Sequence, residues 1–249
     1  MNPYLDIQIN NHILQLHLNR PDKKNALDLA MYQTLADSIN AANDNDDIKV
    51  IFISAAGDAF CSGNDLKDFM QNPPQDETSS VFQFIHALVN AQKPLVAAVN
   101  GAAVGIGTTM LLHCDLVYAN QMASFSLPFV HLGLCVEAGA SLLLPRLCGH
   151  QKAAEFTLLG EAFDAQQASA IGLVTQVVDA DSLLHIAQDR CIQLTQLSAE
   201  AVQTTRRLLK EPIKSQLKQA IKDESEEFIR LLNRDEAQKI LQGFLNRLR

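Results

Sequence analysis

The residue whose type and surroundings most favour chemistry is Glu137, a carboxylate between apolar and small neighbours in Leu134-Cys135-Val136-Glu137-Ala138-Gly139. A carboxylate in such a setting can transfer protons as a general acid or base. A helical pattern over residues 141–147 follows directly. A negative charge near the N-terminus of a helix stabilises that helix through its dipole. Position alone therefore leaves two roles open for Glu137, proton transfer and helix stabilisation.

Two closely spaced glycines, Gly105 and Gly107, precede a predicted helix over residues 108–113. Glycine lets the backbone approach a ligand closely, and the first amides of a helix have no partner within it. Such amides can stabilise an oxygen that carries negative charge. A dinucleotide-binding fingerprint would need a third glycine where the chain has Met110, so the pattern disfavours a Rossmann site.

A second polar segment, Ala59-Phe60-Cys61-Ser62-Gly63-Asn64-Asp65-Leu66, also holds candidate groups. Ser62 precedes a glycine, but the nucleophile turn of hydrolases needs another glycine where Phe60 stands. We therefore interpret Ser62 as a turn residue. Asp65 is placed either to cap a helix that begins at Leu66 or to contact a ligand.

Alternating and apolar runs predict the strands that would position these groups. The predicted strands cover residues 5–10, 12–19, 49–54, 95–99, 115–119 and 173–178. Asp28 is placed to cap a helix between the second and third of them. The recurring order of strand, helix and strand predicts an α/β core.

The C-terminal part of the chain differs from the rest in pattern and charge. Amphipathic helices are predicted at residues 201–210, 213–232 and 235–248. Residues 1–197 carry 9 Lys and Arg against 20 Asp and Glu, a net charge of −11, whereas residues 198–249 carry 11 against 8, a net charge of +3. We expect a core over residues 1–197 and, over residues 198–249, a helical region that covers the core or a neighbouring subunit. Its Arg247 and Arg249 are candidates to reach an anionic ligand of that neighbour.

Composition limits the class of protein. A chain of 249 residues, 47% of them hydrophobic, can bury a large core. Five cysteines without a close pair favour reduced thiols. The sequence shows no apolar run of about 18 residues and no leader pattern. Together these features predict a cytoplasmic protein without a membrane partner. The net charge of −8 disfavours nucleic-acid binding.

Six ordered pieces, spread over roughly residues 5–180, resemble the enoyl-CoA hydratase/isomerase (crotonase) family. They are Asn19-Arg20-Pro21, Ala59-Phe60-Cys61-Ser62-Gly63-Asn64-Asp65, Lys93-Pro94-Leu95-Val96-Ala97-Ala98-Val99-Asn100-Gly101, Cys114-Asp115, Leu144-Pro145-Arg146-Leu147 and Ile171-Gly172-Leu173-Val174. The resemblance implies an α/β fold, a crotonase-like spiral of ββα units with a C-terminal helical trimerisation region. It also implies a homotrimer, or a hexamer built as a dimer of trimers.

The resemblance further implies an acyl-CoA thioester substrate held between two backbone amides. Carried over by motif, these are the amides of Asn64 and Ile106. Further contacts to coenzyme A or substrate are expected from Lys24, Ala26, Ser62, Gly63, Asp65, Lys67, Gly105 and Phe129, of which the two lysines would reach phosphates. Coenzyme A is part of the substrate, so no separate cofactor and no metal are expected.

The same resemblance bears on the reaction. The two glutamates of the family's hydratases fall at Thr109 and Phe129, neither of which is an efficient general base. Glu137 stands where its Δ3,Δ2-enoyl-CoA isomerases carry their single catalytic carboxylate, although many of these have proline where this chain has Val136. The resemblance thus implies an isomerase of fatty acid β-oxidation that moves a proton from C2 to C4. Apolar neighbours are expected to raise the pKa of Glu137.

Two alternatives stay open. A ring-acyl-CoA isomerase of aromatic degradation would use a carboxylate at the same place. A hydratase-like enzyme or a non-catalytic acyl-CoA-binding trimer would need no isomerase carboxylate.

Overall fold

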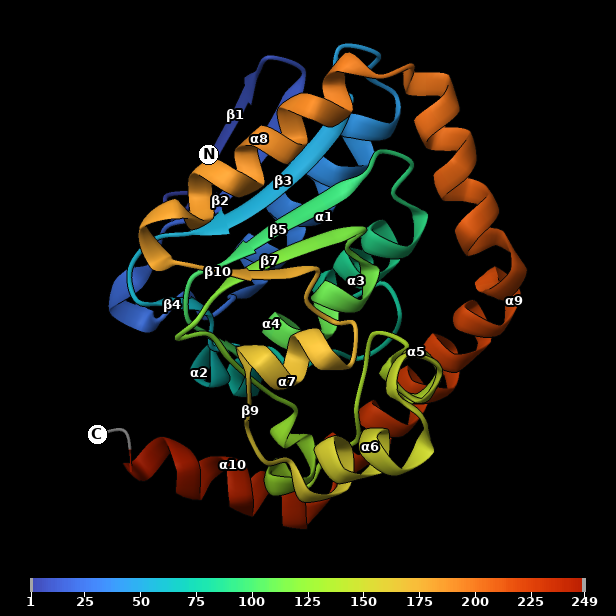
Figure 1. The fold of residues 1–249 in the computed structure, drawn as a ribbon. Coiled ribbons are helices and arrows are strands. Elements are labelled where there is room, and N and C mark those ends of the chain that lie inside the picture. The colour runs from blue at the N-terminus through green and yellow to red at the C-terminus, as the bar shows by residue number, and fades with distance from the viewer. Residues whose placement is uncertain (1, 248–249) are drawn as a thin grey trace.

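The computed structural model describes residues 2–247, and its centre is a six-stranded sheet (Figure 1). The strand order is β1-β2-β3-β5-β7-β10. The strands are β1 (Leu5–Asn10), β2 (Ile13–Leu18), β3 (Val50–Ala55), β5 (Leu95–Val99), β7 (Leu116–Asn120) and β10 (Gln176–Val178). The first two strands pair in an antiparallel arrangement, and the others are parallel to their neighbours.

The apolar runs of the central strands are buried because helices cover both faces of the sheet. Successive side chains of a strand point to opposite faces. Ile51 and Ile53 of β3 join the buried cluster that includes α1 (Leu29–Asn43), whereas Val50 and Phe52 join the cluster that includes α8 (Leu183–Gln196). Residues on both faces of β3 are therefore hydrophobic, as expected of a strand buried on both sides.

A second, shorter sheet has the order β4-β6-β8-β9. It contains β4 (Ala59–Cys61), β6 (Ala102–Val104), β8 (Ser124–Ser126) and β9 (Phe163–Asp164). The chain passes three times from the long sheet to the short one, from β3 to β4, from β5 to β6 and from β7 to β8. This repeat matches the predicted ββα units. Because β4 and β6 are parallel neighbours, their carboxyl ends lie side by side.

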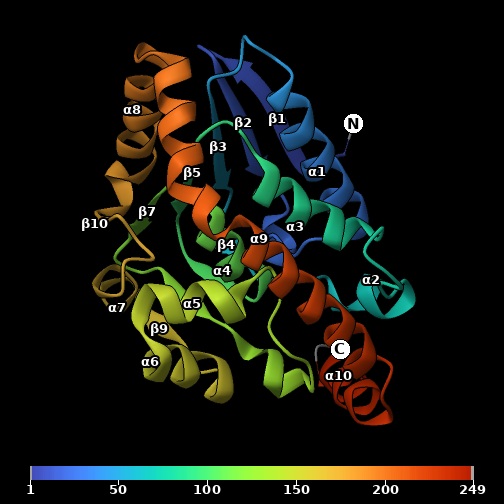
Figure 2. The same ribbon diagram turned by 90° about the vertical axis from the view of Figure 1, so that its right-hand side faces the viewer.

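The remaining helices surround the two sheets (Figures 1 and 2). They are α2 (Leu66–Gln71), α3 (Ser80–Asn90), α4 (Ile106–Thr109), α5 (Ala140–Cys148), α6 (His150–Ala154), α7 (Ala165–Ala170), α9 (Ala199–Leu232) and α10 (Asp235–Arg247). Short 3-10 turns cover Pro21–Lys23, Met110–His113, Pro128–Leu132 and Ala180–Ser182, and a π-helical turn covers Glu155–Leu159. The side chain of Asp28 accepts a hydrogen bond from the Met31 amide at 2.8 Å, so its predicted cap is confirmed.

One predicted helix boundary is wrong. The two helices expected at residues 201–210 and 213–232 are a single helix, α9, with Pro212 inside it. Proline removes one backbone donor and usually ends or kinks a helix. Pro212 and Leu208, whose carbonyl oxygen loses its partner, are both exposed, so water can replace the missing hydrogen bond and the helix continues.

Three other elements differ from expectation in type or length. The helix predicted at residues 108–113 begins earlier, at Ile106, and changes to a 3-10 turn after Thr109. The sequence pattern also predicts a helix over residues 151–158, but its second half is the π-helical turn. The strand predicted at residues 173–178 covers only Gln176–Val178. These differences concern short elements, whose ends are set by tertiary packing more than by local propensity.

The C-terminal helices pack on the core. Leu217, Ile221, Phe228 and Leu232 of α9 belong to the same buried cluster as residues of the sheets, so the division at residues 197 and 198 stays a prediction. Arg249 and the side chain of Arg247 lie outside the described residues. Within residues 2–247, no helix is both long and apolar enough to span a membrane.

Candidate active site

The segments that follow β4 and β6 bring the predicted amides of Asn64 and Ile106 to one edge of the short sheet. β4 and β6 are adjacent and parallel, so their carboxyl ends lie at the same edge of the short sheet. Gly63-Asn64 follows the end of β4, and Gly105-Ile106 follows the end of β6. The structure therefore brings together the two segments that sequence motifs alone assign to one site.

Glycine is required where these segments approach each other. Gly105 has φ +56° and ψ −120°, a conformation that residues with a side chain rarely adopt. A Cβ atom at Gly107 would lie 2.3 Å from the carbonyl oxygen of Cys61. The segment after β6 thus packs directly on the segment after β4, and a larger residue at position 107 would push them apart.

The flanking hydrogen bonds leave the Asn64 amide available. The Leu27 amide donates to the Gly63 carbonyl and the Asp65 amide donates to the Leu27 carbonyl, both at 2.8 Å. Among the described residues, the Asn64 amide itself has no backbone acceptor. Ile106 is the first residue of α4, where an amide has no acceptor within the helix.

Glu137 lies against the same helix. Its side chain is 5% exposed, and the Thr109 hydroxyl donates a hydrogen bond to Oε1. Oε2 is buried and has no hydrogen-bond partner within residues 2–247. An unpaired carboxylate oxygen in the interior is costly for folding, and a role in a reaction is one of the reasons for which a protein keeps such a group.

A strained turn holds Glu137 in this position. Ala138 has φ +60° and Gly139 has φ +76°, so two successive residues are left-handed. The ring nitrogen Nε2 of His113 donates to the Ala138 carbonyl at 2.7 Å. Burial lowers the pKa of His113 to about 4, so this histidine is neutral and has a structural role.

Burial changes the acidity of Glu137. Burial is the main cause of the increase in the pKa of the carboxyl from 4.5 to about 8. The hydrogen bond from Thr109 lowers this pKa, and the negative charge of Glu224 raises it further. The predicted direction is confirmed. A group with such a pKa exchanges its proton readily at neutral pH.

The other predicted contacts lie around the Asn64 segment. The Ser62 amide donates to the Lys24 carbonyl at 3.0 Å, and the Ser62 hydroxyl donates to the Lys23 carbonyl at 3.2 Å. Lys24 and Lys67 are exposed and Ala26 is half-buried. All of these contacts to coenzyme A or substrate stay predictions.

Asp65 and Phe129 have contacts within the chain. Asp65 caps α2 by accepting from the amides of Lys67 and Asp68, and it pairs with Arg20 at 2.9 Å. A Cβ atom on Gly105 would lie 3.7 Å from the ring of Phe129, which is buried. Asp65 thus has a structural role of its own, and Phe129 lies close to the glycine turn.

Sequence reasoning missed three polar partners in this site. Thr109 binds Glu137, the buried Tyr32 donates from its hydroxyl to the Asn64 side-chain oxygen, and Glu224 of α9 binds the turn after Glu137. Only Glu224 had a visible signal, because a charge falls among the apolar positions Leu217, Ile221 and Phe228 of an amphipathic helix.

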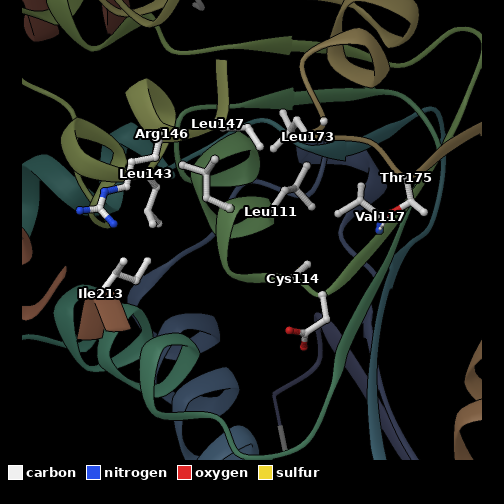
Figure 3. A pocket seen from close by; sticks show the side chains of 12 residues that line it. Leu111, Cys114, Val117, Leu143, Arg146, Leu147, Leu173, Thr175 and Ile213 are labelled. Carbon is white, nitrogen blue, oxygen red and sulfur yellow. Dashed lines mark hydrogen bonds between the residues drawn. The ribbon is translucent and has the colours of Figure 1, made fainter. Parts of the chain in front are cut away.

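A separate cavity of about 270 Å³ lies between the 3-10 turn η2 (Met110–His113), α5, β7 and α9 (Figure 3). Its walls are mostly apolar and include Leu111, Leu143, Leu173 and Ile213, with Arg146 also lining it. None of the predicted site residues lines it. Within residues 2–247, no cluster of His, Cys, Asp and Glu has the arrangement of a metal site.

The repeated ββα units, with the Asn64 and Ile106 segments at one sheet edge and the buried Glu137 nearby, are the arrangement of an enzyme of the crotonase class. The family model described as "Enoyl-CoA hydratase/isomerase" matches residues 8–249. The chain therefore belongs to the enoyl-CoA hydratase/isomerase family, whose members are acyl-CoA enzymes.

Individual relatives support this. An enoyl-CoA delta isomerase 3, described as peroxisomal, from Mus musculus is 34% identical over 94% of this chain and 76% of its own. A 1,2-epoxyphenylacetyl-CoA isomerase of Escherichia coli is 37% identical over 71% of this chain and 70% of its own. The structure of Pseudomonas aeruginosa OdaA, 42% identical, covers 98% of this chain and 99% of its own with a TM-score of 0.94. Other relatives are hydratases.

Proposed function

We propose that the protein is a Δ3,Δ2-enoyl-CoA isomerase of fatty acid β-oxidation that acts in the cytoplasm. The observation that carries this proposal is the buried carboxylate of Glu137, with one oxygen bound by Thr109 and the other without a partner among the described residues. The family resemblance assigns Thr109 and Phe129 to the two positions where the hydratases carry glutamates. One carboxylate can transfer one proton out and back, which is what a double-bond shift requires.

The ionised Glu137 takes a proton from C2 of a 3-enoyl thioester. The C2–H bond electrons form the C1–C2 double bond of an enolate, and negative charge develops on the thioester oxygen. The amides of Asn64 and Ile106 donate to that oxygen, an interaction that is typically worth about 10² to 10³ in rate for each donor. The protonated Glu137 returns the proton to C4, and the electron pairs shift to leave a C2–C3 double bond.

The raised pKa suits this cycle. Glu137 must be ionised to accept the proton and neutral after it has done so. With a pKa of about 8, it is a stronger base than an exposed carboxylate, although a smaller fraction is ionised at neutral pH. We therefore expect an isomerase rate that rises with pH up to about 8.

The test is to incubate the protein with a straight-chain 3-enoyl-CoA in deuterated water. Conjugated 2-enoyl-CoA is followed by absorbance, and deuterium and added water by mass spectrometry. We expect conversion without a hydration product, reduced about 10²- to 10⁴-fold in Glu137→Gln with coenzyme A affinity retained. Near-normal conversion by Glu137→Gln would refute the role of Glu137.

The relatives suggest the second substrate class to assay. Because one of them is named for the isomerisation of a ring acyl-CoA, a ring-bearing enoyl-CoA is assayed beside the straight-chain one. Turnover of the ring substrate alone would move the assignment to a ring-acyl-CoA isomerase. A 3-hydroxyacyl product would identify a hydratase, and tight binding without exchange at C2 a binding protein.

A further inference from the structure

The turn that carries Glu137 is held by a second buried carboxylate, which comes from α9. Glu224 of α9 is 7% exposed. Its Oε2 accepts a hydrogen bond from the Gly139 amide at 2.6 Å, and its Oε1 accepts one from the Ser141 amide at 2.8 Å. These amides belong to the start of α5, so Glu224 caps that helix from a segment 85 residues further along the chain.

The apolar neighbours of Glu224 on α9 pack on the same turn. A Cβ atom at Gly139 would lie 2.3 Å from Leu217 and 3.4 Å from Ile221. One turn beyond Glu224, Phe228 makes edge-to-face contacts with Phe69 and Phe129, at centroid distances of 6.0 and 6.5 Å. Figure 2 shows α9 passing beside α5. One face of α9 therefore reaches the base-carrying turn and the aromatic side chain beside the glycine turn.

We propose that Glu224 is a positioning residue for Glu137, which holds the 137–141 turn through two backbone hydrogen bonds and places a second negative charge behind the candidate base. This inference rests on the proposed isomerase function. It makes α9 part of the active site, although α9 lies in the C-terminal region of the chain. Capping by a neutral side chain would fix the turn, but would not supply the charge.

Four other titratable groups close to Glu137 are neutral near pH 7. The pKa of Tyr32 from α1 is raised well above 10, that of Cys61 from β4 to about 12, and that of Cys135 to about 11, each mainly by burial. The pKa of His113 from η2 is lowered to about 4. Burial also raises the pKa of Glu224, while the amides of Gly139 and Ser141 and the Ser141 side chain act against this increase. Glu224 is thus the group whose charge bears on Glu137.

The experiment compares pH–rate profiles of three variants with the wild type. Glu224→Gln removes the charge but keeps a side chain of nearly the same size. We expect kcat to fall about tenfold, because one amide of the turn loses its acceptor, and the acid limb of the profile to move to lower pH, because the repelling charge is gone. In Ile221→Ala the packing of α9 against Gly139 is loosened but the charge of Glu224 is kept, so the acid limb should stay in place.

Glu227→Gln is the matched charge control, since Glu227 lies on the same helix but is exposed and pairs with Arg230 at 2.5 Å. It should leave the profile unchanged. The proposal is overturned if Glu224→Gln keeps the wild-type acid limb, or if Ile221→Ala moves it equally far.

A second readout separates this inference from the assigned reaction. The carboxyl carbon of Glu137, identified in a ¹³C-glutamate-labelled protein by its loss in Glu137→Gln, is titrated by NMR. A lower pKa in Glu224→Gln supports the positioning role even if the protein turns over no 3-enoyl-CoA. An unchanged pKa contradicts it even if the isomerase reaction is found.

Discussion

The Thr109 hydroxyl donates a hydrogen bond to Oε1 of Glu137 while Oε2 has no partner within residues 2–247. The two oxygens of the candidate base are thereby made different. The hydrogen bond from Thr109 fixes the orientation of the carboxyl group, and in the proposed reaction the other oxygen would exchange the proton. Thr109 would thus support the candidate base.

Removing the Thr109 hydroxyl should weaken catalysis and change its pH dependence. The hydrogen bond lowers the pKa of Glu137, so in Thr109→Val that pKa should rise further and the acid limb should move to higher pH. We expect kcat to fall about ten- to a hundredfold, as for loss of a hydrogen bond to a charged group. Thr109→Ser, which keeps the hydroxyl, should stay near the wild type. Steady-state rates between pH 5 and 10 measure both effects.

The buried Glu137 should make stability depend on pH. Its pKa is 4.5 when exposed and about 8 in the folded protein, so the folded state binds more protons between these values. Stability should therefore decrease as pH rises from about 4.5 to 8, relative to Glu137→Gln, and stay level above 8. The gap should reach roughly 3 to 5 kcal/mol. Urea unfolding of both proteins from pH 5 to 9 checks this, and a pH-independent gap would contradict it.

Gly107 should be essential for the position of the Ile106 amide. In Gly107→Ala the new methyl group would meet the Cys61 carbonyl oxygen, which cannot move independently of its strand. We expect kcat to fall about 10²-fold because one donor to the thioester oxygen is displaced. Gly243→Ala is the control, since its surroundings in α10 are open. It should keep the rate and gain about 0.5–1 kcal/mol in stability. Equal rates for the two variants would count against the Ile106 amide.

The hydroxyl of Tyr32 should steady the Asn64 segment. Tyr32 is 1% exposed and donates to the side-chain oxygen of Asn64. In Tyr32→Phe we expect a loss of about 1 kcal/mol in stability and a several-fold lower kcat, with KM little changed. Tyr118→Phe, at a buried tyrosine in the cluster with α8, should keep kcat. Thermal unfolding and steady-state kinetics of both variants test this prediction. An unchanged kcat in Tyr32→Phe would show that Asn64 does not need the hydrogen bond from Tyr32.

Local features of the chain could be read without a structure because neighbouring residues decide them. The buried strands follow from apolar runs, the caps by Asp28 and Asp65 from an acidic side chain before a helix, and the turn at Gly105 from the backbone freedom of glycine. Glu137 stood out because a charge among apolar residues is unusual. Motifs at ordered spacing were enough to indicate the family and its fold.

Contacts between distant residues were decided by tertiary structure alone. Thr109 and Glu137 are 28 positions apart, Tyr32 and Asn64 are 32 apart, and Gly139 and Glu224 are 85 apart. No local propensity links such pairs, because the order of the strands and the path of α9 bring them together. The same packing buries Glu137, which raises the pKa of its carboxyl to about 8, as the proposed reaction would need.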